Sequence, residues 1–287
     1  MAALAARLPD GQLHLQHGPI DLVIEAWGKR EEVERAYRIA WERFQDVLQV
    51  LVDELPLLRA PVSDPYPLAR GPVARRMVAV VWPHRAVFVT PMAAVAGAVA
   101  DEMLQALLFE NDLKKAYVND GGDIAVYVGP GESFKTGIVN DPFHAELNAT
   151  LYLDASCCVA TSGWRGRSKS LGIADAVTVL ARSAAAADAA ATLIANAVNV
   201  EHPAIRRLPA HAVKHDSDLG GLPVTVGVGE LPPEKITQAL DNGLAAARRM
   251  RSRGLIDAAY LALQGETAVC AAETFPALEL RHKLRSS

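Results

Sequence analysis

One helix-period pattern constrains this chain more than any other feature. Apolar residues recur at intervals of three and four residues from Val33 to Leu55, and Pro56 ends the run. The pattern predicts one long amphipathic helix. The residues before it, Ile20 to Trp27, predict a strand. The first part of the chain therefore combines a strand with a long helix.

Prolines and β-branched residues shape the next segment. Residues 60–72 contain four prolines and predict a loop, since proline cannot donate to a regular hydrogen-bond ladder. Two strand-like runs follow, Met77 to Trp82 and Arg85 to Thr90, on either side of a Pro-His dipeptide. This arrangement predicts a hairpin.

A second helix is predicted to begin at Pro91, because proline is tolerated in a first turn. Its first half consists almost entirely of alanine and glycine, up to Ala100. Side chains this small predict that another element approaches the backbone of this helix closely.

The remaining predicted elements alternate irregularly. Two further helices are predicted at about Ser183 to Val198 and Glu234 to Arg253. Short apolar runs predict further strands at 116–119, 124–128, 135–139, 149–153, 176–181, 224–228 and 267–270. This order favours an α+β fold over a doubly wound parallel sheet. With no short repeat and no low-complexity linker, residues 1–287 are predicted to form a single compact domain.

Composition limits the classes of partner. Hydrophobic residues make up 51% of the chain, and the formal net charge is −4. Such a chain can bury a large core, and it has no excess of Lys and Arg to neutralise a nucleic-acid backbone. We therefore expect a small-molecule partner, with a homo-oligomer left open.

Location follows from cysteine content and from the apolar stretches. Three cysteines are too few and too unevenly spaced for a disulfide framework or a zinc site. No secretion signal is recognised, and Asp101 and Glu102 interrupt the most apolar stretch, Met92 to Leu108. We expect a cytoplasmic protein without a membrane partner.

The first candidate site is the segment Asn119-Asp120-Gly121-Gly122-Asp123 between two apolar runs. Asp-Gly and Gly-Gly are preferred in tight hairpin turns because they accept a positive φ, so a plain turn is the first interpretation. The second is a ligand site, where glycines let the backbone approach a ligand that the flanking Asn119 and Asp123 orient.

The second candidate is a loop rich in hydroxyls, glycines and cations. It consists of Ala160-Thr161-Ser162-Gly163 followed by Trp164-Arg165-Gly166-Arg167-Ser168-Lys169, and its three cations are Arg165, Arg167 and Lys169. Backbone N–H groups and Arg side chains both favour phosphate, so the loop is a candidate anion cradle. An ordinary polar surface loop is the equally weighted alternative.

The third candidate lies in the alanine-rich helix that Ser183 is suited to cap. Asp188 and Thr192 are one helical turn apart, and Asp188 has no cation three or four residues away. Neither a local ion pair nor capping explains this carboxylate. A hard cation such as Mg²⁺, bound through oxygen with phosphate completing its shell, is one interpretation, and a solvated helix face is the other.

Four motifs in this order resemble the ApbE family of FAD-dependent flavin transferases, which use Mg²⁺ to move FMN from FAD onto a protein threonine. They are Ala96-Gly97-Ala98-Val99-Ala100-Asp101 for K-G-x-x-x-D, Val118 to Asp123 for V-N-x-G-G-[DN], Ala160 to Gly163 for A-T-S-G, and Ala187 to Thr192 for A-D-A-x-x-T. Within that family the chain is most similar to an uncharacterised cytoplasmic branch.

The resemblance implies an ApbE-like T-fold of two related, intertwined halves around a pseudo-dyad. It further implies that Asp188, Thr192 and the backbone carbonyl of Ala93 hold Mg²⁺. The dinucleotide, FAD or FMN in this interpretation, would be lined by the remaining matched residues. These are Gly121, Gly122, Thr161, Ser162 and Gly163.

Two departures separate the chain from the transferases. Ala96 stands where they carry Lys, and their H-I-x-D-P-x-T-G segment is shortened to Gly172-Ile173-Ala174-Asp175. Both changes remove polar groups of the kind that stabilise charge in phosphoryl transfer. We therefore expect a flavin- or nucleotide-phosphate-binding protein with Mg²⁺. An active FMN transferase or FAD pyrophosphatase and a non-catalytic interaction protein are the alternatives.

Overall fold

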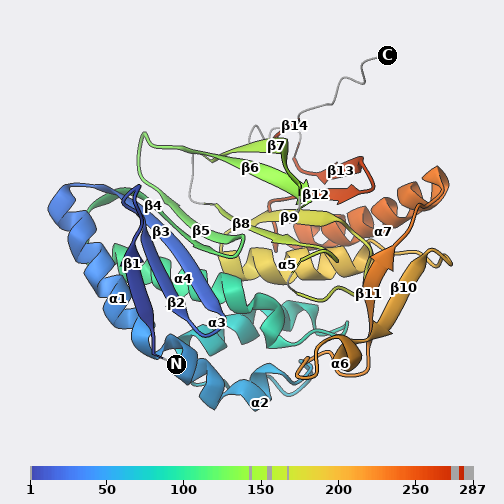
Figure 1. Cartoon of the computed structure of the whole chain (residues 1–287), viewed down its shortest axis with the longest axis horizontal. Helices are drawn as coiled ribbons and strands as arrows, with labels where there is room; N and C mark the ends of the chain where they lie inside the picture. The colour runs from blue at the N-terminus through green and yellow to red at the C-terminus, as the bar shows by residue number, and fades with distance from the viewer. Residues whose placement is uncertain (1, 142–143, 154–156, 167, 273–277, 281–287) are drawn as a thin grey trace. The chain divides into compact units, whose positions relative to one another are not determined.

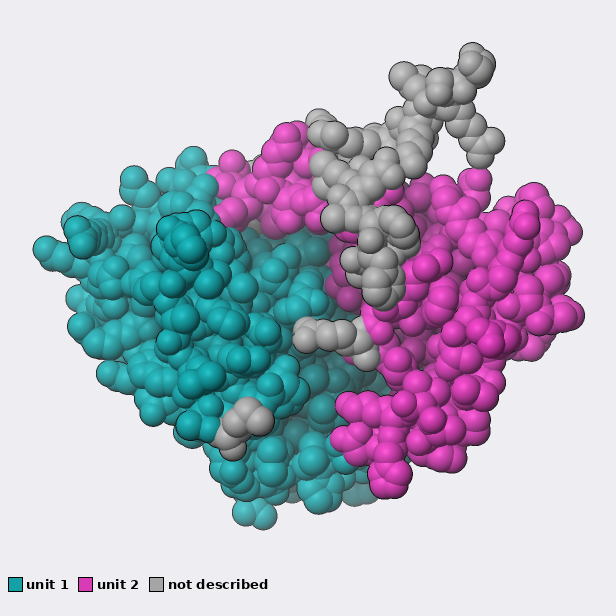
Figure 2. Space-filling model, viewed as in Figure 1, with its two compact units in different colours: residues 1–132, 155–160, 180–189 teal, residues 133–154, 161–179, 190–287 magenta. Residues whose placement is uncertain are grey.

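The computed structural model describes residues 2–141, 144–153, 157–166, 168–272 and 278–280. The chain divides into two compact units (Figure 2). Unit 1 is Met1–Glu132, Ala155–Ala160 and Leu180–Ala189. Unit 2 is Ser133–Asp154, Thr161–Val179 and Ala190–Ser287. The single domain of two related halves stays a prediction.

Unit 1 contains an antiparallel sheet in which strand order follows chain order. Each strand pairs antiparallel with the next. The strands are β1 (Leu4–Arg7), β2 (Leu13–His17), β3 (Ile20–Gly28), β4 (Leu113–Asp120) and β5 (Asp123–Val128). Alternate residues of β3, including Leu22 and Ile24, are buried, as expected of a strand with one face on the core.

Helices cover this sheet within unit 1. They are α1 (Arg30–Asp53), α2 (Leu55–Leu58), α3 (Pro72–Val81) and α4 (Val95–Leu108), with 3₁₀ turns η1 (Trp82–His84) and η2 (Pro91–Ala94). The long helix α1 contacts β2, β3 and α4, and α4 contacts β4 and β5 (Figure 1). The apolar stripe predicted from the sequence is the buried face of α1, including Tyr37 and Phe44.

The predicted hairpin at Met77 to Thr90 is wrong. Residues 72–81 form α3, η1 follows, and residues 85–90 form no strand. Val73, Met77, Val78 and Val81 are fully buried on one side of the helix. Their spacing fits a helix as well as a strand, and the run of β-branched valines favoured the wrong choice.

Three elements contribute residues to both units: β8 (Cys158–Ser162), β9 (Ala176–Ala181) and α5 (Ala184–Ala197). Within unit 1, Ile124 of β5 pairs with Val159 of β8. The alanine-rich helix α5 agrees with the predicted bounds to within one residue at each end.

The described residues of unit 2 form three groups of strands. A three-stranded sheet has the order β14 (Leu278–Leu280), β7 (His144–Leu153), β6 (Phe134–Asp141), and β10 (Ile205–Pro209) pairs with β11 (Pro223–Val228). The third group has β12 (Ala258–Leu263) beside β9 and β13 (Glu266–Cys270). Helix α7 (Pro233–Ser252) packs on β12 and β13, and the short α6 (Ala210–Val213) follows β10 (Figure 1).

The α+β class is confirmed, and the sequence did not predict the strands β1, β2, β8, β10, β12 and β14. All four residues of β1 are exposed, so this strand has no buried face, and β2 is a short run of five residues in which only Leu13 and Leu15 are buried. Every residue of β12 is buried, so it shows no alternation at all.

One helical stretch among the described residues, Pro91–Leu108, is long and apolar enough to cross a membrane by length and composition. About half of it, 56%, is buried inside the protein. Val99, Met103 and Leu107 of this stretch are fully buried in the core. A core helix meets the same test, so the stretch is weak support for a membrane span.

Candidate functional site

Helices α4 and α5 touch at their backbones. A Cβ atom built on Gly97 of α4 would lie 2.2 Å from the carbonyl oxygen of Ala184 in α5, far inside contact distance. Only glycine fits this position. The close approach predicted from the small residues of α4 is therefore confirmed, and the element that approaches is the first turn of α5.

Asp188 lies at this helix contact within unit 1. Its Oδ2 accepts a hydrogen bond from the backbone N–H of Gly97 at 3.1 Å, and the side chain is half-buried. Gly97 belongs to the first turn of α4, whose N–H groups have no partner within the helix. The carboxylate thus binds an unsatisfied helix end. This contact differs from the solvated helix face that was the other interpretation of Asp188.

The charge on Asp188 is unfavourable in this position. Burial raises the pKa of Asp188 well above its ordinary value of 3.8, and the neighbouring carboxylates of Asp123 and Asp120 raise it further. Backbone N–H groups of Gly97 and Ala96 act in the opposite direction. In the part of the chain that the structure describes, no Lys, Arg or His forms an ion pair with Asp188. A bound cation would offset this repulsion.

Asp101 provides a second carboxylate at the same helix contact. Its Oδ1 accepts the N–H of Ala184 at 2.9 Å and its Oδ2 accepts the N–H of Ala185 at 3.0 Å. Ser183 caps the same helix end, because its Oγ accepts the N–H of Ala186 at 3.2 Å. The cap predicted at Ser183 is confirmed. Burial raises the pKa of Asp101, against the two backbone hydrogen bonds and Arg76, which lower it.

The segment Asn119 to Asp123 forms a two-residue hairpin turn between β4 and β5. Asp120 and Asp123 are paired across the turn, and Asn119 Oδ1 accepts the N–H of Gly122 at 2.8 Å. Gly121 and Gly122 have φ values of +64° and +112°. The turn interpretation is confirmed. Whether the turn also binds a ligand stays a prediction.

The segment that begins at Thr161 belongs to unit 2, and the side chains of Thr161, Trp164 and Arg165 already have partners there. Thr161 and Thr178 hydroxyls lie 2.8 Å apart. The Nε1 of Trp164 and the Nε of Arg165 both donate to Asp175 Oδ1, each at 3.1 Å. Arg165 is therefore held by an ion pair, which competes with the predicted role in binding phosphate.

Glycines set the backbone course around this segment. A Cβ on Gly163 would lie 2.3 Å from the carbonyl oxygen of Asp175, and one on Gly172 would lie 2.0 Å from that of Ala195. The backbone N–H of Gln264 also donates to Asp175 Oδ2, at 2.6 Å. The shortened segment Gly172 to Asp175 thus packs tightly and anchors three neighbours.

The remaining predicted site residues are Ala93, Thr192, Ser162 and Arg167. Ala93 lies in the 3₁₀ turn η2 and is half-buried, and its N–H donates to Thr90. Thr192 follows Asp188 by one turn in α5 and is counted with unit 2. Ser162 ends β8, and Arg167 lies outside the described residues. Among those described residues, no three His, Cys, Asp or Glu side chains form a group that could hold a metal.

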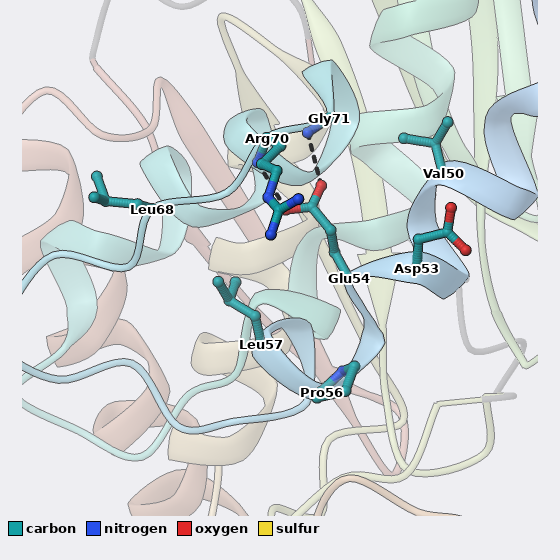
Figure 3. Close-up of a pocket in the computed structure, with 8 residues that line it drawn as sticks. All are labelled: Val50, Asp53, Glu54, Pro56, Leu57, Leu68, Arg70 and Gly71. Carbon is teal, nitrogen blue, oxygen red and sulfur yellow. Dashed lines mark hydrogen bonds between the residues drawn. The ribbon is translucent and has the colours of Figure 1, made fainter.

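Sequence analysis did not single out the hollow shown in Figure 3. This cavity of about 540 Å³ lies in unit 1 between the end of α1, α2 and the start of α3. The Glu54 carboxylate accepts the N–H groups of Arg70 and Gly71 at 2.7 Å each, and Leu68 is 83% exposed at the rim. Its lining residues are Val50, Asp53, Glu54, Pro56, Leu57, Leu68, Arg70 and Gly71, none of which is a predicted site residue.

The model of the family described as AbpE bacteria matches residues 5–269. The chain therefore belongs to this ApbE-like family, and the resemblance found from the motifs is confirmed.

Relatives in archaea are less informative about activity. A UPF0280 protein of Methanococcus maripaludis strain C6 is 37% identical over 158 residues, which is 50% of this chain and 62% of the relative. One of Methanocaldococcus jannaschii is 41% identical over 117 residues, 38% of this chain and 45% of the relative. The chain thus spans about half the length of the curated relatives it matches.

Solved structures are more distant. The ApbE protein of Thermotoga maritima is 16% identical with a TM-score of 0.47, covering 95% of this chain and 97% of that chain. A mutant of the flavin transferase ApbE from Vibrio cholerae is 13% identical with a TM-score of 0.45, covering 92% of this chain and 98% of that chain.

Proposed function

We propose that this protein binds a flavin or another nucleotide-phosphate ligand together with Mg²⁺, and that Asp188 is the carboxylate that holds the metal. Membership of the ApbE-like family and the motif resemblance support the ligand class. The single observation that carries the proposal is the position of Asp188, half-buried at the amino end of α4, where its carboxylate accepts the Gly97 N–H while burial and the charges of Asp123 and Asp120 raise its pKa.

The oxygen groups at this place fit a hard cation. Mg²⁺ is commonly bound through one or two carboxylates together with phosphate oxygens and water. A carboxylate offers about four acceptor positions, so Asp188 can accept the Gly97 N–H and still bind a metal. The Ala93 carbonyl is a further oxygen of unit 1 in the proposed ligand set. A bound Mg²⁺ would neutralise the carboxylates and attract phosphate.

The amino end of α4 favours the anionic partner of such a metal. α4 has fourteen residues, and its first N–H groups and dipole attract negative charge. The turn Asn119 to Asp123 belongs to the same unit and supplies glycines that leave the backbone open to a ligand. The participation of Thr161, Ser162, Gly163, Arg165, Arg167 and Thr192 stays a prediction, as do the cytoplasmic location and the absence of nucleic-acid and membrane partners.

Thermal shift measurements with FAD, FMN and ATP, each with and without Mg²⁺, test the proposal. A ligand that binds only the native state raises the melting temperature by mass action. We expect stabilisation by at least one nucleotide that depends on Mg²⁺ and disappears in Asp188→Asn. Stabilisation that is equal with and without Mg²⁺, or that survives in this variant, contradicts the metal assignment. No stabilisation by any of the three contradicts the ligand class.

A further inference from the structure

Helices α4 and α5 each carry a carboxylate that accepts N–H groups from the first turn of the other helix. Asp101 lies four residues after Gly97, and Asp188 lies four residues after Ala184. Asp101 accepts from Ala184, and Asp188 accepts from Gly97, so each helix is capped by the carboxylate of the other. Local sequence does not reveal this reciprocal capping, because each hydrogen bond joins residues more than eighty positions apart.

From this reciprocal capping we propose that Asp101 is a positioning residue that holds the Asp188 carboxylate against the amino end of α4. The proposal rests on the proposed function only in treating that carboxylate as a metal ligand. The positioning itself is a property of the two helices.

The contacts of Asp101 place constraints on α5 that few other side chains could supply. Both of its oxygens are used, at 2.9 and 3.0 Å, on successive N–H groups of the first turn of α5. The side chain is only 8% exposed, so water cannot readily replace it. Two bonds to successive residues fix the rotation of α5 as well as its distance from α4.

The rotation of α5 decides where Asp188 points. Asp188 is one turn beyond Ala184, on the same side of the helix. The absence of a side chain at Gly97 lets the backbones touch, so a small shift of the first turn of α5 directly lengthens the 3.1 Å bond from Gly97 to Asp188. Loss of the Asp101 hydrogen bonds should therefore weaken the hydrogen bond from the Gly97 N–H to Asp188, so that this amide hydrogen exchanges faster with solvent.

The test compares Asp101→Asn with Ser183→Ala by amide hydrogen exchange at Gly97. Asparagine keeps the shape but has one oxygen, so one of the two N–H groups of α5 loses its acceptor. The Ser183 hydroxyl caps the same helix end through Ala186, within α5 itself, which makes Ser183→Ala a matched control for simple loss of a cap. We expect the Gly97 amide to exchange about tenfold or more faster in Asp101→Asn than in the wild type. This increase should exceed any change at Leu104, which reports on opening of the rest of α4.

If Asp101→Asn does not fold, Asp101→Ser provides a second variant. Serine has a single oxygen on a shorter side chain, so at least one of the N–H groups of Ala184 and Ala185 loses its acceptor, and no atom is added to the buried contact. It too should accelerate exchange at Gly97. Exchange at Gly97 that matches the control, or that rises equally along all of α4, overturns the proposal.

Binding of Mn²⁺ alone, measured by titration calorimetry on the same proteins, separates this proposal from the proposed function. Loss of a group that orients a metal ligand typically lowers metal affinity by about 10- to 100-fold, which is the effect expected for Asp101→Asn. A wild-type protein that binds no Mn²⁺, with Gly97 exchange still dependent on Asp101, rejects the proposed function and supports the positioning. Unchanged Mn²⁺ affinity with unchanged Gly97 exchange rejects only the positioning.

Discussion

Asp188 accepts the backbone N–H of Gly97 at 3.1 Å, and this bond joins the two helices that carry two of the family motifs. Gly97 belongs to the first motif and Asp188 to the last. The glycine is required because Ala184 lies directly against it, and an acceptor oxygen at position 188 is favoured because the first turn of α4 has N–H groups without partners in the helix. The two motifs therefore act together as one structural unit within unit 1.

Replacing Gly97 with alanine should destabilise the protein, although alanine is the better helix former by about 0.8–1.0 kcal/mol. The added Cβ would lie 2.2 Å from the Ala184 oxygen and 2.7 Å from the Ala185 nitrogen, so the helices must separate. Overpacking of this kind costs about 1–3 kcal/mol, and urea denaturation should show a net loss of stability.

Ala96→Gly in the same turn is the control for helix propensity. Ala96 is half-buried, and its replacement should cost about 1 kcal/mol without moving α5. A Gly97→Ala protein that is more stable than the wild type would show that the helices are not in backbone contact.

The features that the sequence predicted well are local ones. The cap at Ser183, the bounds of α5 and the turn at Asn119 to Gly122 depend on residues a few positions apart. The hairpin predicted at Met77 to Thr90 failed because a valine-rich run fits both periods, and burial by neighbouring helices decided in favour of α3.

Replacing Asp188 with asparagine should stabilise the metal-free protein at neutral pH. The pKa of Asp188 is raised in the folded state, so the folded protein binds more protons than the unfolded chain between the ordinary value of 3.8 and the raised pKa. Wild-type stability therefore falls as the pH rises through this window, and the variant lacks this loss. The difference in the free energy of unfolding should be small at about pH 4 and larger at about pH 7.

Denaturation at several pH values, with and without Mg²⁺, measures this difference. Asp241→Asn, which removes an exposed carboxylate of α7, is the control and should change stability little. Mg²⁺ should stabilise the wild type and the control but not Asp188→Asn. An Asp188→Asn protein that is less stable than the wild type at neutral pH would show that the charge is favourable in the folded state.

The two glycines of the β4–β5 turn should differ in their tolerance of alanine. The φ of +64° at Gly121 lies in the left-handed region that other residues can adopt at a cost, whereas +112° at Gly122 lies outside it. A Cβ at Gly122 meets no atom within 4 Å, so any loss there is strain of the backbone alone. We expect Gly122→Ala to lose about 1–3 kcal/mol and Gly121→Ala less.

Thermal denaturation of both variants tests this order, and nucleotide binding tests the second interpretation of the turn. A folded Gly122→Ala protein that binds nucleotide with full affinity would show that the turn has a structural role only. Equal losses in the two variants would contradict the assignment of strain to Gly122.

The roles of Asp101 and Asp175 could not be predicted, because their partners are distant in sequence or offer only backbone groups. Asp101 binds N–H groups 83 and 84 residues away, and alanine supplies no side chain that marks it as a partner. Asp175 was expected within a segment that replaces catalytic groups, and in the structure it binds Trp164, Arg165 and the backbone of Gln264. Sequence locates such carboxylates but does not identify what they bind.

We predict no detectable FMN transfer from FAD onto a threonine-containing peptide. Ala96 lies one residue before Gly97 in α4, where the transferases carry Lys, and Arg165 is paired with Asp175 at 3.1 Å. Loss of one well-aimed electrostatic partner costs on the order of 10²–10³ in rate, and the shortened segment at Gly172 removes a second. Mass spectrometry of the peptide after incubation with FAD and Mg²⁺ measures the adduct. A robust adduct that is absent with Asp188→Asn would show that other groups replace the missing Lys and that the protein is an active transferase.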